Sequence, residues 1–153
     1  LAMYADPYRL YLGGFYTPTQ LTNAALTDPQ ADNDLDGEPN YLEYAFNTRP
    51  NDAASVAHFR GGLYVTNILG TNLSYPTVVF PERVDTEAPS YTVEVSNDLL
   101  NWRTNQPDIP PETIMVEPAI PNTNGTQSVT VRYHQAVQDG FDRIFLRLRI
   151  SPP

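Results

Sequence analysis

The second half of the chain alternates apolar and polar residues, as a β-strand with one buried face does. The clearest case is residues 144–150, in which Arg147 and Arg149 lie between apolar neighbours. Residues 91–96 and 128–133 show the same pattern, and residues 63–69, 77–80 and 113–116 are weaker strand candidates. Six short strands separated by turns rich in proline and asparagine predict a mainly β fold, an antiparallel β-sandwich of immunoglobulin-like or jelly-roll-like type over residues 56–153.

The first half of the chain has helical spacing. Thr17, Pro18 and Gln20 form a helix-start signal with a capping box, so we expect a helix over residues 17–26. Its buried side would carry four apolar residues, Leu21, Ala24, Ala25 and Leu26.

A second helix is expected over residues 40–46, with Leu42, Ala45 and Phe46 facing inward. Asn47 can terminate it. The two helices and the loop between them would form a small EF-hand-like subdomain over residues 17–52.

Residues 1–16 form an aromatic-rich tail. Within it Tyr8, Leu10 and Leu12 alternate like a strand, and two glycines separate them from the rest of the chain. A terminal strand on a flexible joint can pair with its own sheet or with the exposed edge of a neighbour. Because the chain begins at Leu1, we also expect a processed or excised form.

The most informative segment is an acidic loop at residues 32–43. Carboxylates fall at its positions 1, 3 and 5, glycine at 6, an amide at 9 and glutamate at 12, which are Asp32, Asp34, Asp36, Gly37, Asn40 and Glu43. This is the spacing of an EF-hand loop, in which Ca²⁺ takes about 6–8 oxygen ligands. The glycine permits the sharp turn by which the chain curls around the ion.

The remaining positions of the loop also fit calcium. We expect Glu38 to offer its backbone carbonyl, Asn40 a direct or water-mediated contact, and Glu43 two oxygens. Five acidic side chains within twelve residues would repel one another without a cation. The sequence therefore predicts Ca²⁺ as the cofactor. The alternative, an acidic solvated turn that binds nothing, leaves the six matching positions unexplained.

The charge and the residue composition limit the kinds of partner and chemistry open to the chain. The net charge is −9 and the isoelectric point about 4.4, which argues against nucleic acid as a partner. The absence of cysteine excludes disulfides and thiol catalysis. No stretch approaches the ~20 apolar residues of a membrane span. A solitary EF-type loop is typical of extracellular modules, so we expect an extracellular or cell-surface location.

Three segments of the chain resemble a known module. Residues 34–50 read DLDGEPNYLEYAFNTRP, residues 91–102 read YTVEVSNDLLNW, and residues 143–150 read RIFLRLRI. They resemble, in the same order, the motifs of C-terminal modules in large secreted planctomycete and verrucomicrobial proteins. The loop is also similar to those of dockerins and thrombospondin type 3 repeats.

The resemblance implies a calcium-stabilised, secreted β-module without known catalysis. By position it implies five metal ligands, Asp32, Asp34, Asp36, Asn40 and Glu43. Pro39 departs from the aliphatic residue with which EF-hands pair a second loop, so we expect a solitary site.

Other chemistry has little support. His58 and His134 are isolated, and no serine lies in a G-x-S-x-G context. Trp102 follows a strand and a turn, where it either packs in the core or offers a platform for sugar stacking.

The sequence thus favours a non-enzymatic structural or adhesive surface module. In one version the module is a subunit of a surface filament, a homo-oligomer joined through the tail. The alternative is a carbohydrate-binding module with a polysaccharide partner.

Overall fold

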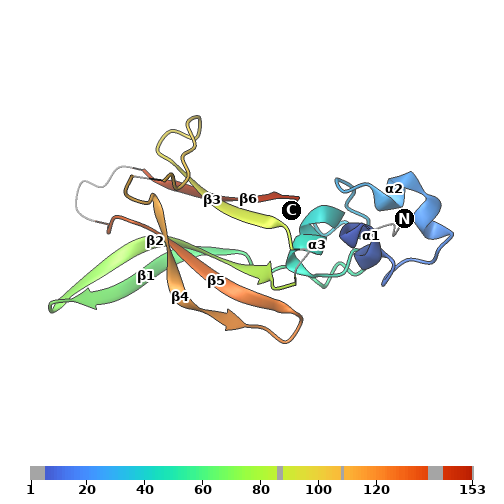
Figure 1. The fold of residues 1–153 in the computed structure, drawn as a ribbon, viewed down its shortest axis with the longest axis horizontal. Helices are drawn as coiled ribbons and strands as arrows, with labels where there is room; N and C mark the ends of the chain where they lie inside the picture. Colours follow the sequence, from blue (N-terminus) through green and yellow to red (C-terminus); the bar gives the residue numbers. More distant parts are fainter. Residues whose placement is uncertain (1–5, 86–87, 108, 138–142, 153) are drawn as a thin grey trace.

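The computed structural model describes residues 6–85, 88–107, 109–137 and 143–152. The molecule is elongated, with the short helices at one end and the strands at the other (Figure 1). Residues 1–5 of the predicted tail lie outside the described residues. Within the described residues, no helix has the length and apolar character to cross a membrane.

The protein is mainly β, and both of its sheets are antiparallel (Figure 1). The larger sheet has the order β1-β2-β5-β4, with β1 at Arg60–Ile68, β2 at Thr71–Arg83, β5 at Thr126–Tyr133 and β4 at Thr113–Pro121. The smaller sheet pairs β3, Ser90–Ser96, with β6, Phe145–Ser151. All six predicted strand segments are confirmed. Strand β2 is longer than expected because it pairs with β1 over one half and with β5 over the other.

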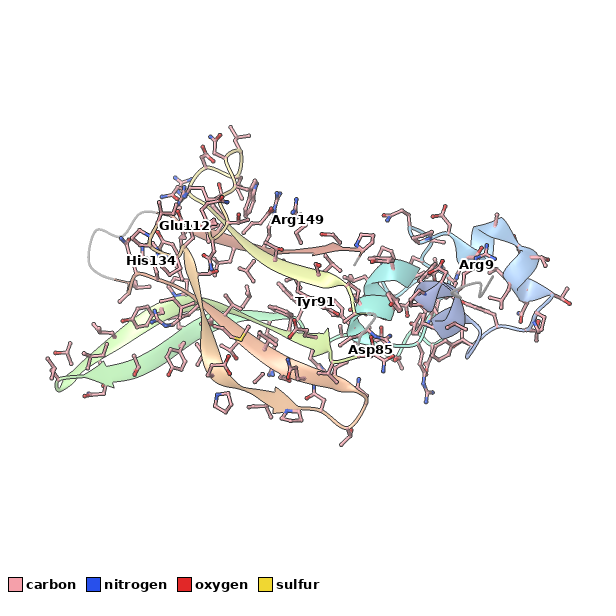
Figure 2. The ribbon with its side chains drawn as sticks, viewed as in Figure 1. Arg9, Asp85, Tyr91, Glu112, His134 and Arg149 are labelled. Atoms are coloured by element: carbon pink, nitrogen blue, oxygen red, sulfur yellow. The ribbon has the colours of Figure 1, made fainter. Side chains whose placement is uncertain are left out.

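The two sheets share one hydrophobic core. Its buried members come from β2, β3, β5 and the helix before the strands, and they are Phe46, Val78, Phe80, Val93, Val129 and Val131. Leu146, Leu148 and Ile150 of β6 pack against them, as the alternation predicts. Arg147 and Arg149 are exposed, and Arg149 points away from the larger sheet (Figure 2).

The predicted strand at residues 8–12 is wrong. These residues belong to helix α1, Pro7–Leu12, which Asp6 caps by accepting a hydrogen bond from the Tyr8 N–H at 3.1 Å. Proline at the first helical position and an aspartate before it are helix-start signals. They outweigh the alternation because Tyr8 and Leu12 also lie on one face of a helix, whereas Leu10 is 64% exposed.

The helix expected over residues 17–26 is broken in two. The capping box forms, since the Thr17 N–H donates to Gln20 Oε1 and the Gln20 N–H to Thr17 Oγ1. The turn that follows is only a 3₁₀ helix, η1, Gln20–Thr22, because Asn23 is extended with ψ 108°. Asn23 then caps helix α2, Ala24–Thr27. Ala24 and Ala25 are exposed, contrary to the expected buried side.

Helix α3 spans Asn40–Phe46, as predicted, and Asn47 ends it with a left-handed φ of 55°. Its aromatic side packs on α1 in a second cluster, whose buried members are Tyr8, Leu12, Tyr16 and Tyr44. Its other side faces the strands, where the Tyr91 hydroxyl donates to the Ala45 carbonyl at 2.6 Å (Figure 2). Helix α3 therefore connects the helical end of the molecule to both sheets.

Candidate metal centre

Three aspartates converge in the loop that leads into α3. Each of Asp32, Asp34 and Asp36 places a carboxylate oxygen within 4.8 Å of the other two. Leu35 and Gly37 have left-handed backbone, with φ 65° and 95°, so the chain curls between the carboxylates. This cluster could hold a metal ion.

Glu43, on α3, is near enough to interact electrostatically with the three aspartates, although it is not one of the carboxylates that lie within 4.8 Å of one another. It is 0% exposed, and neither of its carboxylate oxygens has a hydrogen-bond partner among the described residues. Burial, and then the charges of Asp34, Asp36, Glu38 and Asp32, raise the pKa of Glu43 to about 8. A buried carboxylate that faces other carboxylates is unfavourable unless a cation joins them.

Two of the aspartates also present unpaired oxygens. Asp34 Oδ2 accepts the Asp52 N–H at 2.7 Å, and Asp36 Oδ1 accepts the Glu38 N–H at 2.7 Å. Their other oxygens, Asp34 Oδ1 and Asp36 Oδ2, are buried without a partner. With the two Glu43 oxygens they make four of the five buried side-chain atoms in the described chain that lack a hydrogen bond. Buried polar atoms are nearly always paired, so this concentration in one place requires an explanation.

The chemistry of these four oxygens fits a hard cation. All are carboxyl oxygens, and carboxylates are the ligands that Ca²⁺, Mg²⁺ and Mn²⁺ prefer. In the described part of the chain, no arginine lies within ion-pair distance of a carboxylate in the loop. The protein itself therefore provides no counter-charge at this place.

Asp32 is held differently from its neighbours. Its Oδ1 accepts the Leu35 N–H at 2.8 Å, and its Oδ2 accepts the Gly37 N–H at 2.9 Å. Asp32 is the predicted first position of the loop, and its carboxylate stabilises the turn by accepting these two backbone N–H groups. Carboxylate oxygens have two lone pairs each, so these bonds leave Asp32 able to contact an ion.

Asn40 lies in the scaffold behind the loop. Its Nδ2 donates to the carbonyls of Leu26 and Asp28 at 3.1 and 2.9 Å, and its Oδ1 accepts from Asn33 Nδ2 at 2.9 Å. The structure thus does not place this side chain among the unpaired oxygens. Its role here is to fix the entry to the loop against α2.

Glu38 connects the loop to the segment that precedes β1. Both of its carboxylate oxygens accept the Ala57 N–H, at 2.9 and 3.1 Å. Burial raises its pKa, and the Ala57 N–H opposes that rise. The expectation that its backbone carbonyl binds an ion stays a prediction.

Several supporting groups escape the loop pattern. The Asp52 and Ala57 N–H groups, which hold Asp34 and Glu38, lie 18 and 19 residues further along the chain. Asn33 Nδ2 donates to the Tyr16 hydroxyl at 3.1 Å and to the Leu26 carbonyl at 2.9 Å. No sequence spacing points to these contacts, because they depend on how separate segments pack.

The other candidate residues are occupied by structural contacts. The Arg147 guanidinium lies 3.9 Å from the centre of the Trp102 ring, so it covers one face of the indole. His134 Nδ1 lies 3.1 Å from the Glu112 carbonyl oxygen. Comparisons of the chain with protein families, with curated proteins and with solved structures found no match.

Proposed function

We propose that residues 32–43 bind one Ca²⁺ ion, and that the ion stabilises a non-enzymatic, extracellular structural module. In this proposal the strands form a β-sandwich, and the helical end is an EF-hand-like subdomain that carries the ion. The observation that carries the proposal is the set of four buried, unpaired oxygens on Asp34, Asp36 and Glu43.

Calcium suits this set better than magnesium. Ca²⁺ accepts bidentate carboxylates and irregular geometry, whereas Mg²⁺ demands near-ideal octahedral geometry and keeps several waters. Glu43 is fully buried and offers both oxygens from a fixed position on α3. The loop would add further ligands, which are Asp34 Oδ1, Asp36 Oδ2 and an oxygen of Asp32. Water molecules can complete the coordination shell.

An ion at this place would act on the whole molecule. Helix α3 carries Glu43 on one side and contributes Phe46 to the core shared by the two sheets. The loop is also bonded through Asp34 and Glu38 to the segment that leads into β1. Loss of the ion would therefore loosen the joint between helices and strands, which supports a structural role for calcium.

The extracellular location that we propose follows from the calcium affinity expected of a solitary EF-type loop. EF-type sites of extracellular modules bind calcium at about 10⁻⁴–10⁻³ M, so they are filled outside the cell. A single loop that pairs with no second loop in the described part of the chain is typical of that range. Sugar stacking, the alternative function, gains no support from Trp102, because Arg147 covers a face of its ring.

Isothermal titration calorimetry on the intact chain tests the proposal. We expect one Ca²⁺ per chain, weaker binding of Mg²⁺, and loss of the calcium signal in Asp34→Asn. The matched control is Glu117→Gln, which changes an exposed carboxylate on β4. Absence of calcium binding at millimolar concentration, or equal binding by Asp34→Asn, would overturn the assignment.

A further inference from the structure

The two sheets differ in width, and this leaves part of the larger sheet uncovered. Strand β1 lies at the edge of the four-stranded sheet, while the facing sheet contains only β3 and β6. Gly61 pairs with Val78, a core residue, so Leu63 and Val65 lie on the core-facing side of β1. They are nevertheless 61% and 56% exposed. Their exposure shows that the smaller sheet does not cover them.

An apolar groove lies beside β6, between this strand and helix α3. It has a volume of about 660 Å³ and is lined by Leu146, Leu148 and Ile150 of β6, by Phe59 just before β1, and by residues of the loop and α3 that include Leu42 and Phe46. Phe59 is 45% exposed. The groove thus extends from β6 to the residue that precedes β1, so both strands border the same side of the molecule.

Both of these edges have unpaired backbone groups. Among the described residues, β1 pairs only with β2, and β6 pairs only with β3. The other two edges are obstructed. Strand β4 contains Pro118 and Pro121 and an irregular register after Val116, and β3 carries a bridge from Val95 to Arg103. An open, extended edge is a template for a further strand.

The β1 edge carries no charge after its first residue, Arg60. Residues 61–81 contain no Asp, Glu, Lys or Arg, although the chain carries a net charge of −9. Natural edge strands are commonly protected by charge or proline, and β1 has no proline and no charge beyond Arg60 at its first position. Two acidic copies of this chain could approach each other here with little repulsion.

We propose that a second copy of this chain docks on this side through a two-fold axis parallel to the strands. The arrows in Figure 1 show that β1 and β6 run in opposite directions. Rotation about such an axis keeps the direction of each strand and places the larger sheet of one copy beside the smaller sheet of the other. Strand β1 of each copy would then pair antiparallel with β6 of the other. The Leu63 and Val65 side chains of the two copies would then pack against one another.

A second copy fits better than an unrelated extended peptide. A single peptide strand on β6 would cover the groove but leave the β1 edge open. A two-fold copy satisfies both edges and both uncovered apolar stripes at once, which is the self-complementarity of an isologous interface. The closed pair also differs from a filament joined by the tail, since residues 7–12 are a helix packed on their own α3.

The test is the mass of the intact chain in solution, by light scattering after size exclusion and by sedimentation equilibrium. We expect wild type to contain two chains per particle and Val65→Glu to contain one, because the change puts two new carboxylates face to face. Ile120→Glu, on β4 at a site 66% exposed, is the matched control and should remain a dimer. Because Val65 is already exposed within one chain, Val65→Glu should leave the monomer folded, with a cooperative thermal unfolding transition.

A cysteine variant tests the symmetry. The chain has no cysteine, so Val65→Cys introduces a single thiol. Under mild oxidation we expect a disulfide-linked dimer in high yield, and no such product from Ile120→Cys. A monomeric wild type at millimolar concentration, dimers of Val65→Glu as stable as wild type, or a ladder of higher polymers would each overturn the two-fold interface.

Discussion

Replacing Glu43 by glutamine separates the two effects of this side chain. Glutamine has nearly the same shape but carries no charge, so it cannot supply two anionic oxygens to an ion. In a chelator the same change removes a buried charge that faces Asp34 and Asp36. We therefore expect Glu43→Gln to be at least as stable as wild type without calcium, and less stable than wild type with calcium.

The magnitude follows from mass action. Calcium at about 100 times its dissociation constant stabilises the folded state by ~2.7 kcal/mol. In a chain of this size each kcal/mol raises the melting temperature by about 2–4 °C, which gives a shift of roughly 5–11 °C for wild type. If the variant binds about 100-fold more weakly, the same calcium concentration supplies only ~0.4 kcal/mol, or roughly 1 °C.

The assay is thermal unfolding followed by circular dichroism at pH 8, with chelator and with a calcium series. Glu117→Gln is the control, because it removes an exposed carboxylate on β4 and should keep the full calcium shift. The reasoning would be refuted if Glu43→Gln kept the wild-type shift. It would also fail if the variant were several degrees less stable than wild type in chelator, since Glu43 would then have a partner within the protein.

Three further predictions follow from the structure. In chelator, wild-type stability should fall as pH rises from about 4.5 to about 8, because folded Glu43 keeps a proton that the unfolded chain releases; thermal unfolding across this range should show the slope, and Glu43→Gln should flatten it. Phe80→Ala should cost about 3–5 kcal/mol in urea unfolding, and Ile120→Ala less than about 0.5 kcal/mol; equal costs would contradict the assigned core. Arg147→Ala should lower the free energy of unfolding in urea by about 1–3 kcal/mol, although the side chain is on the outer face. The reason is that it removes the 2.6 Å salt bridge to the buried Glu94 carboxylate. A loss near zero would show that this pair contributes nothing to stability.

The strands could be predicted because one physical pattern decides them. Alternation placed Leu146 and Leu148 on the core side and Arg147 outside, and the structure agrees. Strong alternation of this kind allows only one face to be buried, so packing and sequence give the same result. The width of each sheet could not be predicted, because alternation does not state which strands are neighbours.

The tail shows where periodicity is ambiguous. Tyr8 and Leu12 lie on one side of a strand and also on one side of a helix, so only Leu10 distinguishes the two structures. Asp6 and Pro7 decide in favour of the helix, since they cap and start it. The break at Asn23 has a similar origin, because its side chain caps a new helix instead of continuing the old one.

At the candidate site, the sequence predicted which residues lie in the loop but not the direction in which each side chain points. Carboxylate spacing correctly brought Asp32, Asp34 and Asp36 together. It could not show that Asn40 turns toward the carbonyls of Leu26 and Asp28, because those carbonyls come from a segment outside the loop. The complete burial of Glu43 is likewise a result of tertiary packing.

The most direct measurement is a crystal structure grown in calcium, with anomalous diffraction to identify the ion. The account requires a single ion at about 2.3–2.6 Å from Asp34 Oδ1, Asp36 Oδ2 and both carboxylate oxygens of Glu43. Crystals at saturating calcium that show no ion in this loop, or an ion that leaves the Glu43 carboxylate without a metal contact, would contradict it.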